Sequence, residues 1–192
     1  AGAESYNVAV GHDAGYAMTT GTHNTIMGGL AGLALQNGSR NIAIGYAALS
    51  TEDSGAKNVA VGWKALEALN YNGDGYNVAI GYNTGAAMDS GLRNTIVGAL
   101  AGDAITSGQY NTALGYNALS AEDAHGHNTA VGADALRSLN AGANAYNVAV
   151  GYDAGYAMST GVYNTLVGGR AGDVLTTGGY NVALGFDALG AE

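Results

Sequence analysis

The sequence predicts an all-β fold, a β-solenoid or β-roll, because a short strand motif recurs along the whole chain. The motif is Asn, a β-branched residue, Ala or a larger aliphatic residue, then Val, Ile, Leu or Met, then Gly. It occurs eleven times, at spacings of 17, 17, 17 and 19 residues that form a 70-residue super-repeat. The segment YNVAVGHDAGYAMTTGTHNT, which begins at Tyr6, returns at Tyr146 with four changes. We therefore expect a single solenoid domain over residues 1–192, with about eleven 17-residue laps.

Each motif begins with Asn. Identical Asn side chains stacked at a coil corner can hydrogen-bond along the axis and satisfy the backbone of the turns. We therefore interpret the asparagines as a structural ladder that needs no ligand. They are Asn7, Asn24, Asn41, Asn58, Asn77, Asn94, Asn111, Asn128, Asn147, Asn164 and Asn181.

The three residues after each Asn are typical of a strand, since the first is β-branched in every lap and the third is always Val, Ile, Leu or Met. The middle residue is Ala in most laps, but Ile26, Ile96 and Leu166 occupy it one super-repeat apart. A strand with one face in water alternates apolar with polar residues, and these strands do not. We expect one face to lie on the chain's own core and the other on neighbouring laps or subunits.

Gly ends each strand motif, which indicates a corner with positive φ or a close approach of two backbones. These glycines are Gly11, Gly28, Gly45, Gly62, Gly81, Gly98, Gly115, Gly132, Gly151, Gly168 and Gly185.

The rest of each lap contains apolar residues and a polar turn. WKALEALN (residues 63–70) and ADALRSLN (residues 133–140) have the leucine spacing of a helix, so we expect short helical turns there. Most laps then pass through a Gly-containing turn. The two 19-residue laps extend that turn, which predicts loops that protrude at equivalent places.

Composition argues against several classes of function. The net charge is −9 with only six Lys and Arg, so we expect no nucleic-acid partner. The absence of Cys excludes disulfide scaffolds and cysteine-based metal sites. No apolar run approaches the roughly 20 residues that span a bilayer, so we expect no membrane insertion.

We expect neither an enzyme nor a cofactor, because no catalytic triad, paired acid or phosphate loop is present in the sequence. His125 and His127 lie two residues apart, but no carboxylate recurs at ligand spacing, so we expect no metal. The pairs Glu52-Asp53 and Glu122-Asp123 recur 70 residues apart, and we interpret them as solvated charges.

Two columns of residues are candidates for a binding surface. The residue before each Asn is always aromatic or cationic, and the residue after each strand Gly is often aromatic. At the strand spacing of about 4.8 Å such residues form ladders, which either dock sugars or stack on themselves and shield the β-edges or a subunit seam. The candidate binding residues of the second column are Tyr46, Trp63, Tyr82, Tyr116 and Tyr152.

The string NTALGYNAL at residues 111–119, with YNVALGFDALG near the end of the chain, resembles the repeats of bacteriophage tail-fibre and tailspike proteins. Such repeats often lie upstream of an endosialidase-type intramolecular chaperone. The chain is more distantly similar to the heads of YadA-like trimeric autotransporter adhesins. The resemblance runs from about Ser5 to Ala191, and the lap is longer than the usual adhesin-head lap. With no neck, anchor or chaperone sequence present, we expect a repeat segment of something longer.

The resemblance implies a trimer on an extracellular or virion surface. We therefore expect a structural, adhesive fibre module that mediates attachment to a host or cell surface through a glycan or protein receptor. One alternative is a self-assembling extracellular filament. A lesser alternative is an ice-binding solenoid, although the first strand column mixes Thr with Val and Ile.

Overall fold

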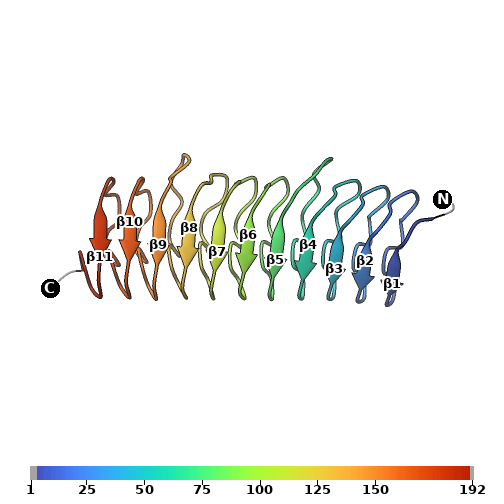
Figure 1. The fold of residues 1–192 in the computed structure, drawn as a ribbon, viewed down its shortest axis with the longest axis horizontal. Coiled ribbons are helices and arrows are strands. Elements are labelled where there is room, and N and C mark those ends of the chain that lie inside the picture. Colours follow the sequence, from blue (N-terminus) through green and yellow to red (C-terminus); the bar gives the residue numbers. More distant parts are fainter. Residues whose placement is uncertain (1–3, 191–192) are drawn as a thin grey trace.

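The computed structural model describes residues 4–190, which form one elongated stack of laps with the two ends of the chain at opposite ends of the stack (Figure 1). Residues 1–3 and 191–192 of the predicted domain lie outside the described residues. Each lap contributes one three-residue strand. The strands are β1 (Val8–Val10), β2 (Thr25–Met27), β3 (Ile42–Ile44), β4 (Val59–Val61), β5 (Val78–Ile80), β6 (Thr95–Val97), β7 (Thr112–Leu114), β8 (Thr129–Val131), β9 (Val148–Val150), β10 (Thr165–Val167) and β11 (Val182–Leu184).

All eleven strands belong to one parallel sheet, in which the spatial order is the order of the sequence. Equivalent residues of successive laps pair in register, as in Val8 with Thr25 and Thr25 with Ile42. A strict repeat produces this register because each lap places the same residue type at the same height on its neighbour. The all-β solenoid predicted from the repeat is confirmed.

The middle residue of each strand faces the core. Ile26, Ile96 and Leu166 are fully buried there. Six residues after each of them is a Gly, and a Cβ at Gly32 would lie only 3.2 Å from Cδ1 of Ile26. In the laps whose strand carries Ala43 or Ala60, that later position is a buried Leu. Ala79 and Ala149 are also followed by Gly after six residues, and side chains of the same and adjacent laps fill that space, as Leu66, Met88 and Ile96 do at Gly85. Volumes in the densely packed core therefore complement one another within and between laps.

The prediction of short helical turns at residues 63–70 and 133–140 is wrong, since the described residues contain no helix. Lys64 and Leu66 have φ of 56° and 51°, and Asp134 and Leu136 have φ of 58° and 50°. A right-handed helix needs successive residues with negative φ. The leucine spacing instead places Leu66 and Leu69 in the core from a tight turn.

All the strand glycines have positive φ, and all except Gly185 also meet the backbone of the next lap closely. Their φ values run from 127° at Gly185 to 143° at Gly81. A Cβ at Gly11 would lie 2.7 Å from the carbonyl carbon of Gly28 in the next lap. The chain therefore turns at these corners because two backbones pass each other with no room for a side chain.

The asparagines form a ladder along the solenoid. The backbone N–H of Asn41 donates to Oδ1 of Asn24 at 2.9 Å, and Nδ2 of Asn41 donates to the carbonyl oxygen of Gly55 at 2.8 Å. The backbone N–H bond to the preceding Asn recurs from Asn24 to Asn181. Each side chain from Asn7 to Asn164 thus satisfies backbone groups of the solenoid, which favours one rigid register.

Candidate functional site

The outer face of the sheet runs along all eleven strands. The first and third residues of each strand point away from the core and are partly exposed, with Ile42 at 37% and Ile80 at 39%. Every one of these outward strand residues is Val, Thr, Ile, Leu or Met. Both strand faces were expected to be buried. Within one chain, only the face toward the core is buried, and the other face is partly exposed. We call this surface, formed by the first and third residues of β1–β11, the outer strand face.

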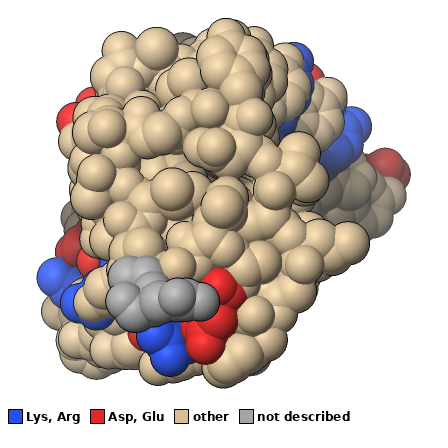
Figure 2. Space-filling model, turned by 90° about the vertical axis from the view of Figure 1, so that its left-hand side faces the viewer, with Lys and Arg blue, Asp and Glu red and all other residues tan. Residues whose placement is uncertain are grey.

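Charged side chains lie outside the outer strand face. Figure 2, seen from the end where β11 lies, shows Lys, Arg, Asp and Glu toward the edges and uncharged atoms over most of that end. Val182 and Leu184 of β11 are 76% and 78% exposed there.

The column before each Asn is a ladder of stacked side chains. Rings of Tyr110 and His127 lie 5.0 Å apart at 15°, and those of His127 and Tyr146 lie 4.7 Å apart at 19°. Cations enter the same ladder, since the Arg93 guanidinium lies 5.3 Å from the ring centroid of Tyr110. Because neighbouring rings cover each other's faces, this column matches the self-stacking alternative and offers mainly ring edges to a ligand.

The second column is a less regular ladder, with rings that are exposed to a similar degree. The side chains of Tyr46, Trp63 and Tyr82 come from three successive laps and are 40%, 48% and 55% exposed. The rings of Tyr46 and Trp63 stack at 4.4 Å and 23°. Tyr116 and Tyr152 are 53% and 60% exposed, and the laps before and after Tyr116 carry Ala99 and Ala133 in this column. The candidate residues therefore form one aromatic run over three laps and two separate tyrosines.

Two carboxylates lie inside the solenoid. Glu52 and Glu122 are fully buried, so the interpretation of both as solvated charges is wrong. They stand eleven residues after Asn41 and Asn111, a position that is Met, Leu or Ile in the other laps up to Leu175. Their place in the repeat, in line with apolar residues of other laps, is the signal that could have identified them as buried. Their residue type alone suggests a position on the surface.

Backbone donors satisfy Glu52. Its Oε1 accepts from the N–H groups of Ser54 at 3.2 Å and Gly55 at 2.6 Å, and its Oε2 accepts from the N–H of Tyr71 at 3.1 Å. Burial nevertheless raises the pKa of the Glu52 carboxyl, and the neighbouring charge of Asp53 adds to the rise.

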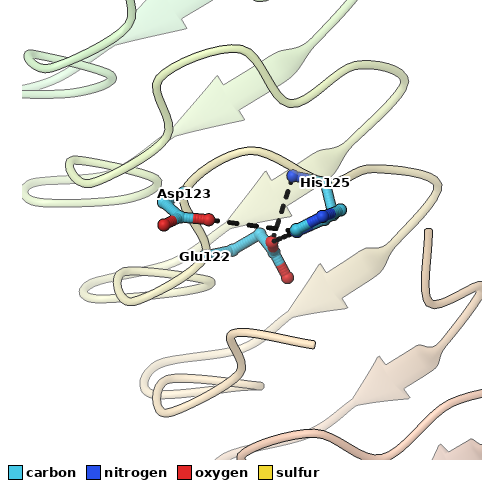
Figure 3. Close-up of side chains that lie close together, drawn as sticks. All are labelled: Glu122, Asp123 and His125. Carbon is cyan, nitrogen blue, oxygen red and sulfur yellow. Dashed lines mark hydrogen bonds and ion pairs between the residues drawn. The ribbon is translucent and has the colours of Figure 1, made fainter. Parts of the chain in front are cut away.

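Glu122 has a different neighbourhood, in which Asp123 and His125 approach it (Figure 3). Nδ1 of His125 lies 3.4 Å from Oε1 of Glu122 and 3.9 Å from Oδ1 of Asp123. Burial raises the pKa of the Glu122 carboxyl as well. Sequence reasoning compared His125 with His127, but the structure places His127 in the ring ladder and His125 beside two carboxylates.

Comparisons of the chain with family models, curated proteins and solved structures give no match. The described residues contain no helix that is long and apolar enough to cross a membrane. Function must therefore be argued from the surfaces described above.

Proposed function

We propose that this chain is a structural and adhesive module of an extracellular or virion-surface fibre, which mediates attachment to a host or cell surface. It acts as a trimer whose subunits pack through the outer strand face, and it has no catalytic role. The observation that carries the proposal is the continuous uncharged outer strand face of β1–β11.

The size of that face favours a protein partner. Ten strand steps of about 4.8 Å give a length of roughly 48 Å, and two side-chain columns give a width of roughly 10 Å. The face therefore has an area on the order of 500 Å², at the upper end of what monomers expose as one apolar patch. In a homo-oligomer the register of one chain is matched by an identical register in its neighbours, so Val and Ile columns can pack along their whole length.

The stiffness of the solenoid suits a fibre. The in-register sheet, the Asn ladder and the strand glycines hold every lap to the next, and the sequence contains no Pro. Resemblance of the repeats to tail-fibre and adhesin-head sequences adds independent support.

The aromatic run of Tyr46, Trp63 and Tyr82 is the proposed contact with the receptor, a surface glycan or a protein. Tyr46 and Trp63 each cover one face of the other, and the exposed parts of these rings and of Tyr82 can pack on the apolar faces of sugars and on protein side chains while their polar atoms remain in water.

The trimer is tested by placing a charge in the outer strand face. Ile80→Lys puts an ammonium between Val61 and Val97, the paired residues of the adjacent strands. Val174→Lys is the matched control, since Val174 is 48% exposed in a turn outside the strands. In sedimentation velocity Ile80→Lys should shift the chain to monomer, while Val174→Lys stays trimeric. Equal masses for the two variants would contradict packing through this face.

A filament is the second candidate, favoured by the exposed apolar residues Val182 and Leu184 at the edge of β11. Parallel strand addition at that edge would continue the sheet from one molecule to the next. It predicts masses that grow with concentration without limit, which the same sedimentation experiment distinguishes from a trimer.

A further inference from the structure

The position eleven residues after each Asn belongs to the core. Nearly all laps place an aliphatic or thioether side chain there, among them the fully buried Leu69, Met88 and Ile105. Glu52 and Glu122 are the exceptions in the part of the chain that the structure describes. A carboxylate at such a position has lost its water and needs partners within the protein.

The two laps solve this problem differently. Three backbone N–H groups bind the two oxygens of Glu52. In the later lap, one super-repeat on, His125 replaces Gly55 and the backbone arrangement changes. Oε1 of Glu122 accepts from the N–H of His125 at 3.2 Å, and the backbone N–H of Ala141, the counterpart of Tyr71, also faces the carboxylate, but Oε2 makes no hydrogen bond of normal geometry to a described residue.

His125 shows a matching deficit. Its Nδ1 is buried and makes no hydrogen bond to any described residue, although it lies within 4 Å of both carboxylates. In Figure 3 the Glu122 carboxylate lies between the side chains of Asp123 and His125. One buried acid, one half-exposed acid and one imidazole thus converge, and the unsatisfied Nδ1 of His125 lies where they meet, while the unsatisfied Oε2 is the second oxygen of the buried carboxylate.

We propose that Glu122, Asp123 and His125 bind one divalent transition-metal ion, of which Zn²⁺ is the representative. Carboxylate oxygen and imidazole nitrogen are both ligands of such ions. Two ligand atoms that each lie about 2.0–2.2 Å from a tetrahedral Zn²⁺ are roughly 3.3–3.6 Å apart. The 3.4 Å between Nδ1 of His125 and Oε1 of Glu122 fits this separation, and Asp123, which is 49% exposed, can turn inward from 3.9 Å.

The ligand set selects against calcium. Ca²⁺ takes six to eight oxygen ligands, whereas this cluster offers two carboxylates and a nitrogen. Two carboxylates and a neutral imidazole carry a charge that one divalent cation balances. Water would complete the coordination.

The backbone around the cluster is held from both sides. Thr106 donates to the carbonyl oxygen of Asp123 through its N–H at 2.6 Å and its hydroxyl at 3.0 Å. Nδ2 of Asn111 donates to the carbonyl oxygen of His125 at 3.1 Å, and the N–H of Gly126 donates to Oδ1 of Asn144 at 3.0 Å. The ligands are therefore presented by an ordered loop, which lowers the entropic cost of binding.

The test titrates the chelator-treated full chain with Zn²⁺ by calorimetry and with Co²⁺ by visible absorption. We expect one ion per chain rather than two, because the equivalent lap has Gly55 in place of His125. His125→Gln and Asp123→Asn should each weaken binding at least tenfold, and both change a partly exposed residue, so the fold should persist. Glu122→Gln should abolish binding, with circular dichroism to confirm that it folds.

His127→Gln is the matched control, because His127 lies two residues away in the ring ladder. It should bind both ions as the unchanged chain does. Absence of saturable binding would overturn the proposal. Unchanged affinity in His125→Gln, or a loss in His127→Gln equal to that in His125→Gln, would also overturn it.

Discussion

Removal of one side chain from the middle of the asparagine ladder should destabilise the whole stack. Asn94 is fully buried, its Nδ2 donates to the carbonyl oxygen of Gly108 at 2.8 Å, and its Oδ1 accepts from the N–H of Asn111 at 2.9 Å. Asn94→Ala leaves both backbone groups buried and unsatisfied. At about 1–3 kcal/mol for each group, the expected loss of unfolding free energy is roughly 2–6 kcal/mol.

The matched control is Asn181→Ala at the end of the ladder. Nδ2 of Asn181 donates only to Oδ1 of Asn164, at 3.0 Å, and that oxygen keeps its bond from the backbone N–H of residue 181. Since water reaches this lap, the expected loss is below about 1 kcal/mol.

Urea unfolding measures both variants, at one protein concentration, with circular dichroism and the fluorescence of Trp63, the one Trp of the chain. A loss below about 1 kcal/mol in Asn94→Ala, or equal losses in the two variants, would refute the role assigned to the ladder.

Three further predictions concern the corners, a buried acid and the aromatic run. Gly28→Ala should lower the free energy of unfolding by at least about 2 kcal/mol, because φ is 129° and the new Cβ would lie 2.6 Å from a carbonyl oxygen. Gly142→Ala is the control, since the space around Gly142 is open, and it should lower that free energy by only about 1 kcal/mol. Thermal unfolding measures both variants. Because burial raises the pKa of Glu52 above its usual 4.5, the stability that this carboxyl contributes is present below pH 4.5 and is lost as pH rises through the raised value. Glu52→Gln should therefore gain stability relative to the unchanged chain as pH rises from 4.5 to 7.5 in urea unfolding, and a difference that does not vary with pH would count against the buried charge. On a glycan array Trp63→Ala should lose binding that Tyr163→Ala retains, and binding that survives in Trp63→Ala removes the run from consideration as the receptor contact.

Strand positions and the fold could be predicted from the sequence because one signal, the motif spacing, fixes both. Thr95 is the β-branched residue that opens a strand, and Gly98 is the glycine that ends it, and the equivalent residues have these roles in every lap. The conformational preference of each residue therefore agrees with the position that the repeat gives it. The asparagine ladder follows from the same register, since identical side chains must lie on top of one another.

The turns could not be predicted in the same way. Leucine spacing at residues 63–70 matched a helix, but Leu66 adopts a left-handed φ of 51° that propensity scales do not anticipate for Leu. Such left-handed residues turn the chain within the lap, and the buried packing of the Leu66 side chain holds it in this conformation.

The buried acids and the cluster around Glu122 were missed for another reason. Acidic residues were interpreted by type, although the register aligned Glu122 with Leu69 and Met88 of other laps. His125 was compared with the adjacent His127, whereas the loop folds it back onto the residue three positions earlier. Comparison of columns across laps, rather than of neighbours along the chain, would have found both.

Packing through the outer strand face is tested most directly by the mass of the chain in solution, measured by light scattering over a concentration series. The account predicts a constant mass of three times 19.0 kDa. A constant mass of 19.0 kDa, with the outer strand face left in water, would contradict it.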